Sequence, residues 1–149
     1  MLAVEIEKAL ALSASGLEVQ RRRMNIIASN LANVNSTKSV NGAPYRRRDL
    51  LIRADRTVSQ PFGTLLNRSG LPEPPGVKSV KVVEDHRPPR QMYEPHHPEA
   101  NADGYVLMPD INTIEEMVNL IGASRAYEAN VTAMTITKTM AQRALEIGR

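Results

Sequence analysis

Residues 112–147 read NTIEEMVNLIGASRAYEANVTAMTITKTMAQRALEI. Apolar side chains recur in this stretch at alternating intervals of three and four residues, the spacing of a coiled-coil seam on an α-helix. Thr113 and Glu116 predict a capping box at the start of this helix, and Gly148 predicts its end. The seam consists of Met117, Leu120, Tyr127, Val131, Met134, Ala141 and Leu145, with Ser124 and Lys138 at the remaining positions.

A second apolar line runs beside the seam in the last turns of the same helix. It consists of Ala133, Ile136, Met140, Ala144 and Ile147. One partner helix can cover one seam, so the second line predicts further neighbours. Burying a side chain of this size contributes about 1.5–3 kcal/mol, which favours assembly of several chains.

The N-terminal part of the chain repeats the same spacing and predicts a second long amphipathic helix. Gly16 interrupts this helix and Gly122 interrupts the C-terminal one. Each glycine is either a point of close helix approach or a plain weak point, because glycine costs about 1 kcal/mol relative to alanine inside a helix. The seam of the N-terminal helix consists of Ile6, Leu10, Leu17, Met24, Ile27, Leu31 and Val34.

All ten prolines lie between Pro44 and Pro109, which divides the chain into a helix (1–34), a non-helical insert (35–111) and a helix (112–149). The predicted fold is mainly α with a small β insert (α+β), in which the terminal helices pair as a coiled coil. Alternation of side chains predicts strands over 45–54 and 77–84, and a short strand over 105–108. Turn residues predict a long loop at about 60–76 and a turn at 41–42, and prolines predict extended chain at 87–90 and 94–99.

Composition narrows the class of protein. The net charge is +3, too weak for a nucleic-acid partner to be expected. Cysteine is absent, and no apolar run is long enough to predict a secretory signal or a membrane-inserted segment. The sequence also lacks a phosphate-binding loop, a dinucleotide-binding turn and a nucleophile elbow. We therefore expect no enzyme, no catalytic residue and no cofactor.

Two groups of side chains could carry chemistry, and for both the simpler interpretation is favoured. Glu94, His96, His97 and Glu99 are metal-ligand types, but their spacing does not place three of them around one ion, so no metal is expected. The runs 21–23 and 46–48 are each three arginines. Consecutive residues point about 100° apart on a helix and to opposite faces of a strand, so neither run makes a focused phosphate site.

The stretch at the end of the N-terminal helix resembles the signature of the flagellar rod and hook axial family. This motif comprises Ser29, Asn30, Leu31, Ala32 and Asn33. Further stretches are similar to the C-type proximal rod branch of that family. They are the sequences PYRR at 44–47, YEP at 93–95, HP at 97–98, GYV at 104–106, MP at 108–109, EMVN at 116–119 and ASRAYEAN at 123–130. His96 departs from the family pattern, in which a small turn residue is common.

The resemblance implies a structural subunit of the bacterial flagellar rod, which polymerises helically with itself and other rod subunits. It implies that the terminal helices line a hollow drive shaft in the periplasmic space, with the insert outside them. It also implies passage through the flagellar type III export apparatus without a cleaved signal peptide. The alternative is a helical adaptor or export chaperone of that secretion system, which would present a similar seam to a partner.

Overall fold

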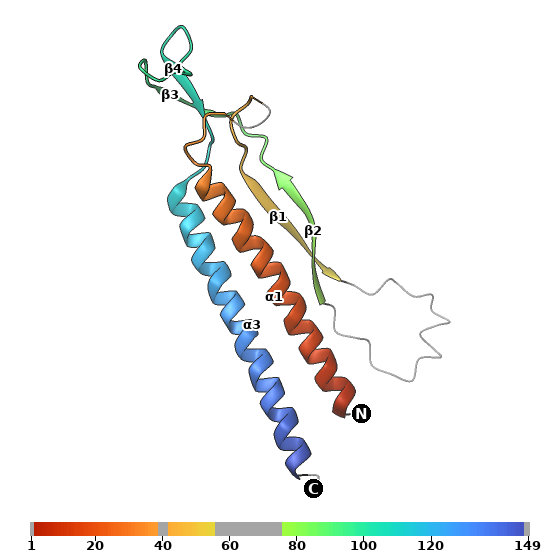
Figure 1. The fold of residues 1–149 in the computed structure, drawn as a ribbon. Coiled ribbons are helices and arrows are strands. Elements are labelled where there is room, and N and C mark those ends of the chain that lie inside the picture. The colour runs from red at the N-terminus through yellow and green to blue at the C-terminus, as the bar shows by residue number, and fades with distance from the viewer. Residues whose placement is uncertain (1, 39–41, 56–75, 148–149) are drawn as a thin grey trace, which may run out of the picture. The chain divides into compact units, whose positions relative to one another are not determined.

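The computed structural model describes residues 2–38, 42–55 and 76–147 (Figure 1). In these ranges the chain is mainly α-helical with a small β region between the helices, as the sequence predicts. The predicted loop over 60–76 lies outside the described residues, except that Gly76 begins a strand, and Asn41 of the predicted turn also lies outside them. The elements in chain order are α1 (Leu2–Ala32), β1 (Arg48–Asp55), β2 (Gly76–Glu84), β3 (Arg90–Tyr93), β4 (Tyr105–Met108) and α3 (Thr113–Ile147).

The fold divides into two compact units, and each long element contributes to both. We call Met1–Arg21, Ile52–Val80 and Arg125–Arg149 the terminal unit. The remaining segments, Arg22–Leu51 and Lys81–Ser124, form the junction unit. The names reflect that the first contains both chain ends and the second contains the connections between helices and strands.

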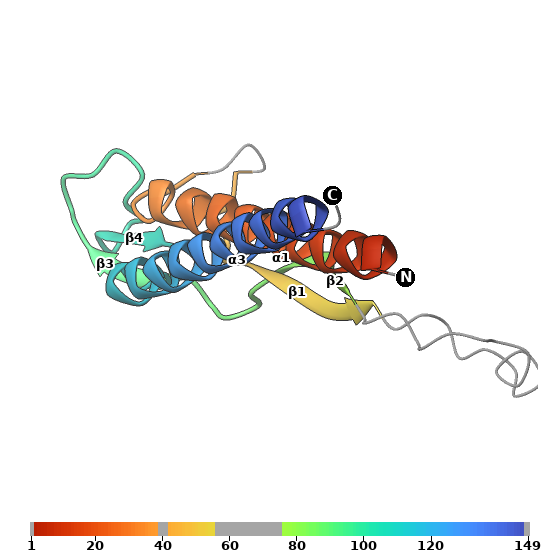
Figure 2. The same cartoon turned by 90° about the horizontal axis from the view of Figure 1, so that it is seen from below.

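In the terminal unit the first half of α1 lies beside the second half of α3, and strand residues lie alongside α1 (Figure 2). A Cβ atom on Gly16 would come within 2.9 Å of Oδ1 of Asn130, so this glycine is a point of close approach between the helices. The backbone N–H of Val77 at the start of β2 donates to Ser15 Oγ at 3.2 Å. Pairing of these helices as a coiled coil stays a prediction.

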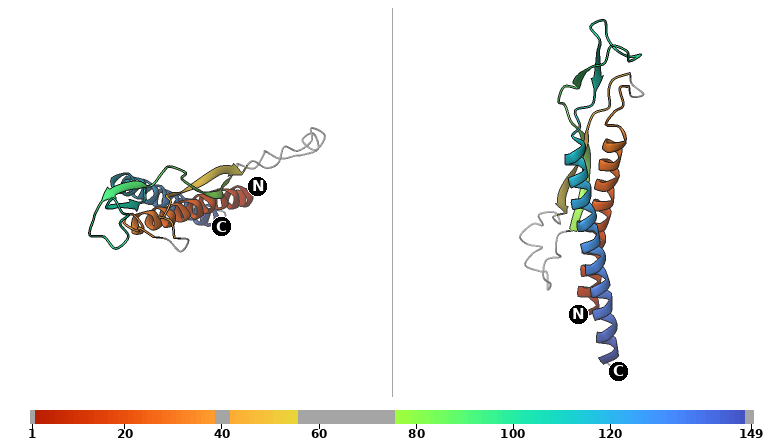
Figure 3. Two further views of the ribbon diagram at one scale, coloured as in Figure 1. Left: turned by 90° about the horizontal axis from the view of Figure 1, so that it is seen from above. Right: turned by 90° about the vertical axis from the view of Figure 1, so that its left-hand side faces the viewer.

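In the junction unit β3 and β4 form an antiparallel hairpin in which Gln91 pairs with Leu107 and Tyr93 with Tyr105. This hairpin lies beyond the end of α1 and the start of α3 (Figure 3). One face of β4 points inward, since Val106 is only 1% exposed. The other buried apolar residues of this unit are Ile27, Leu50, Met108, Pro109, Ile111 and Ala123.

Two local predictions were wrong, and one strand was not predicted. The N-cap of α3 is Asn112, whose Oδ1 accepts from the N–H groups of Ile114 and Glu115, at 3.0 and 3.4 Å. The side chain of Glu116 turns into the protein instead of closing a capping box. Residues 94–99 contain turns, with His97 N donating to Glu94 O at 3.1 Å, and β3 was not predicted. Separately, none of the described helices has the length and apolar character needed to cross a membrane.

Candidate functional site: a buried polar network

The side chain of Asn30 is the centre of a polar network in the junction unit, and it is completely buried. Its Nδ2 donates to the backbone O of Arg48 at 2.8 Å and to Glu116 Oε2 at 3.0 Å. Its Oδ1 accepts from the backbone N of Arg48 and from the hydroxyl of Tyr45, both at 3.0 Å. An asparagine amide can donate twice and accept twice, so all of its capacity is used. One residue of α1 thereby holds β1 and α3.

Glu116 carries the charge of the network and is only 1% exposed. Its Oε1 accepts from Arg47 Nε at 2.8 Å, in an ion pair whose arginine side chain is 18% exposed. Burial lowers the pKa of Arg47. This effect is outweighed by the hydrogen bond to Glu116 and by the negative charges of Glu116 and Asp49, so the pKa is raised above its ordinary value. The arginine therefore stays charged, and a buried carboxylate without it would be costly.

The end of α1 is satisfied by its own side chains. Asn33 Nδ2 donates to the backbone O of Ser29 at 2.8 Å, and Ser36 Oγ donates to the backbone O of Asn33 at 2.9 Å. Carbonyl groups in the last turn of a helix have no partner within the helix, so these bonds mark where α1 stops. The Ser29 hydroxyl also lies 3.4 Å from the Tyr45 hydroxyl, which links this end to the network.

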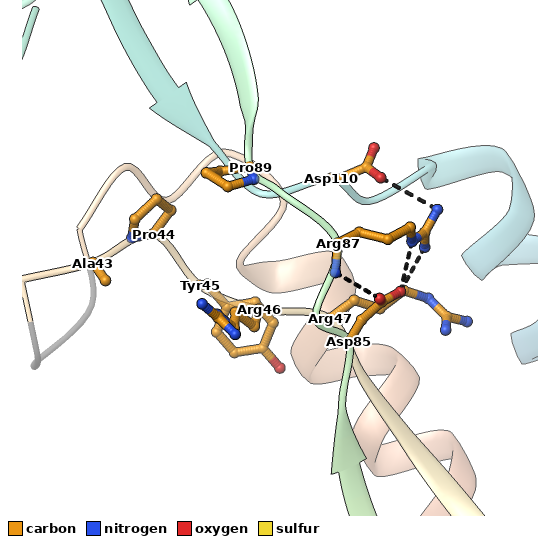
Figure 4. Close-up of a pocket in the computed structure, with 9 residues that line it drawn as sticks. All are labelled: Ala43, Pro44, Tyr45, Arg46, Arg47, Asp85, Arg87, Pro89 and Asp110. Atoms are coloured by element: carbon orange, nitrogen blue, oxygen red, sulfur yellow. Dashed lines mark hydrogen bonds and ion pairs between the residues drawn. The ribbon is translucent and has the colours of Figure 1, made fainter.

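A small cavity of about 60 Å³ lies next to the network (Figure 4). Its residues are Ala43, Pro44, Tyr45, Arg46, Arg47, Asp85, Arg87, Pro89 and Asp110. Arg87 forms two ion pairs, from Nη2 to Asp85 Oδ2 at 2.7 Å and from Nη1 to Asp110 Oδ2 at 3.2 Å. The hydrogen bond from the Arg87 side chain, and a second from its backbone N–H, lower the pKa of Asp85 below 3.8. Arg87 pairs with both carboxylates of the cavity and Arg47 pairs with Glu116, so most of the charges already have partners, which suits a structural contact more than a ligand site.

The other charged candidates from the sequence are dispersed. Arg46 lies 3.3 Å from Nδ1 of His86, and the three arginines at 46–48 have different partners. His97 Nδ1 accepts from the backbone N of Glu99 at 3.1 Å, which stabilises a turn. In the described part of the chain no three His, Asp or Glu side chains gather as a metal site would require.

The predicted seam residues of the N-terminal helix from Ile6 to Leu31 are buried or half-buried, and so is Val34, which lies beyond the end of α1 at Ala32. The C-terminal seam is divided. Leu120, Tyr127, Met134 and Ala141 are half-buried. Met117, Val131 and Leu145 are exposed by 48%, 41% and 76%. Ile136 and Met140 of the second line are also exposed, and the side chain of Ile147 lies outside the described set. These exposed residues are available to partners.

Sequence reasoning did not identify the network as a site. Asn30 was named only as part of the family motif, and Glu116 was interpreted as a capping residue. Tyr45 and Arg47 were placed in a predicted strand, and Arg47 also in an arginine run from which no focused phosphate site was expected. All four residues lie inside predicted elements, and nothing in their spacing pairs them.

Two known protein families match this chain, one near each end. A family described as flagella basal body rod protein matches residues 10–38, and one described as flagellar basal body rod FlgEFG protein C-terminal matches residues 102–147. The flagellar basal-body rod protein FlgC of Bacillus subtilis is 44% identical over 147 residues, with 94% of this chain and 96% of the relative covered.

Relatives from distant bacteria have the same description. The FlgC protein of Salmonella typhimurium is 36% identical over 138 residues, with 93% of this chain and 94% of the relative covered. That of Aquifex aeolicus is 38% identical over 143 residues, with 96% and 97% covered. The similarity therefore extends through the β region as well as the helices.

Proposed function

This chain belongs to the FlgC family of flagellar basal-body rod proteins, and from that premise we propose that it polymerises helically with copies of itself and with other rod subunits. Members of this family are structural subunits of the rod, and no catalytic family is indicated. The comparisons do not support the alternative of an adaptor or export chaperone.

The observation that carries the proposal is the apolar surface of α3 in the terminal unit. Ile136 and Met140, which lie about 40° apart around the helix, are exposed by 54% and 65%. Large apolar side chains gathered on one helix mark a contact surface, because leaving them in water forgoes about 1.5–3 kcal/mol for each. Contacts that repeat from subunit to subunit without closing produce a helical polymer, which is the form a hollow shaft requires.

The route of the chain to the rod is part of the proposal. We infer passage through the flagellar type III export apparatus and assembly in the periplasmic space, within the basal body. The terminal unit supports this inference, since it has little buried apolar surface of its own. Among the described apolar side chains of this unit, Val19, at 3% exposed, is the one that is buried. A unit of this kind gains most of its stability on assembly.

Ile136→Asp tests the proposal. We expect a strain that carries this variant as its sole copy to export the chain normally but to lack it in purified basal bodies, because a charge would be buried in each subunit contact. Gln142→Glu is the matched control, since it adds the same charge at an exposed position of the same helix. Normal incorporation of Ile136→Asp, measured by quantitative mass spectrometry, would contradict the proposed contact.

A further inference from the structure

The first turns of α3 have a buried side and, opposite to it, an exposed apolar side. The inner side contains Glu116, which joins the polar network, and Ala123, which is 2% exposed. The outer side contains Ile114, Val118 and Ile121, exposed by 74%, 63% and 54%. An apolar face of a helix is expected to pack against a neighbour. In the described part of the chain, the outer side has none that buries these residues.

Gly122 lies at the margin of this outer side, one turn after Val118. Apart from its chain neighbours and the adjoining backbone of its own helix, no atom of the described chain comes within 4 Å of the position that a Cβ atom would take on Gly122. The residue is helical and needs no unusual backbone angle, since the positive φ values belong to Gly42 and Gly104. Glycine inside a helix is unfavourable relative to alanine. Gly16 has a reason within the subunit, the nearby Asn130 side chain, but Gly122 has none there.

We propose that the outer side of α3 around Gly122 receives an α-helix of a neighbouring rod subunit, and that the missing side chain lets the two backbones approach closely. This proposal rests on the proposed function, because it names the contact that a polymerising subunit makes here. The occupant is an amphipathic helix with an apolar ridge and a large side chain opposite Gly122. Small residues at a crossing allow the ridges of one helix to enter the grooves of another.

The size of the surface indicates a rod neighbour instead of a dimer in solution. The exposed apolar surface here comes from three aliphatic side chains, Ile114, Val118 and Ile121, far fewer than the about 20–30 residues that each partner contributes to a stable interface. A stable pair of proteins buries about 800 Å² on each partner. The contact therefore needs the additional contacts that a polymer supplies, and the free chain is expected to remain monomeric.

Graded substitution tests the close approach. Gly122→Ala adds one methyl group and Gly122→Leu adds a whole side chain, and both residues favour helix more than glycine does. In the free full-length chain we expect helicity by circular dichroism to be unchanged or higher for both variants. In purified basal bodies we expect Gly122→Leu to be at least about tenfold less abundant than the wild type, with Gly122→Ala between them.

A photo-reactive amino acid at Val118 identifies the occupant. After irradiation of assembled basal bodies, we expect a cross-link to a rod subunit, identified by mass spectrometry. Normal incorporation of Gly122→Leu, or a cross-link from position 118 only to a protein outside the rod, would overturn the inference. Failure of the proposed function looks different, because the unmodified chain itself would then be absent from purified basal bodies.

Discussion

Asn30→Asp is the most demanding test of the polar network, because it exchanges one amide nitrogen for an oxygen and leaves the size of the side chain unchanged. The nitrogen that is lost donates to the Arg48 carbonyl and to Glu116. A carboxylate can only accept. Both partners would then face an oxygen, and Glu116 would face a second negative charge at about its present distance of 3.0 Å.

The expected cost follows from these contacts. A neutral hydrogen bond such as that to the Arg48 carbonyl contributes about 1 kcal/mol, and one to a charged group such as Glu116 about 2 kcal/mol. Asn30 is 0% exposed and Glu116 1%, so water cannot compensate for the repulsion. We therefore expect the free energy of unfolding to fall by at least about 3 kcal/mol, a large part of the roughly 5–15 kcal/mol of an ordinary domain.

Urea unfolding of the full-length chain, followed by far-ultraviolet circular dichroism, measures this loss. Asn25→Asp is the matched control, because Asn25 is an exposed residue of the same helix, and its loss should stay within about 0.5 kcal/mol. The double variant Asn30→Asp with Glu116→Gln should recover at least half of the loss, since the new amide at 116 can donate to the carboxylate. An Asn30→Asp chain as stable as the Asn25→Asp control would refute the assigned role of the network.

The remaining predictions concern three other contacts. Gly16→Ala should lower the free energy of unfolding by about 1 kcal/mol in urea titrations, although alanine favours helix more than glycine does, because the new methyl group would lie 2.9 Å from Asn130 Oδ1. A more stable variant would contradict the close approach. Val131→Asp should leave the free chain folded, since Val131 is 41% exposed, but should prevent the chain from being incorporated into basal bodies. A motile strain with normal rods by electron microscopy would contradict this prediction. Asp85 has a lowered pKa, so its ion pair with Arg87 contributes stability above pH 3.8 that disappears as the pH falls through the lower folded-state value. Asp85→Asn should remove that part of the acid sensitivity of thermal unfolding, and an unchanged pH profile would argue against the assignment.

The helices and most strands could be predicted because their signals are local. α1 and α3 each repeat apolar side chains at helical spacing, and β2 alternates along its length. β3 was missed because the prolines around it were interpreted as marking plain extended chain. The proline rule excludes the α region for the preceding residue but does not distinguish a turn from a strand. This is why the turn closed by Glu94 and His97 was also predicted incorrectly.

The network could not be predicted because its bonds join residues far apart in the sequence. Asn30 is 18 residues from Arg48 and 86 from Glu116. Local rules assign each of these residues a local partner, as the capping box did for Glu116. A buried carboxylate gains more from a cation and an amide inside the protein than from a backbone N–H at a solvated helix start. The tertiary contact therefore prevails over the local one.

The network also determines which side of α3 is left for partners. A buried polar group is satisfied in only one arrangement, so a shift of one residue, which turns a helix by about 100°, would leave Asn30 and Glu116 unpaired. With Glu116 fixed inward, Ile114 and Val118, two residues before and after it, lie about 200° around the helix and must face outward. Buried ion pairs add little net stability compared with apolar packing, but they discriminate strongly between arrangements. The position of the outer surface at Gly122 therefore depends on the Asn30 network, although no side chain of the network forms part of that surface.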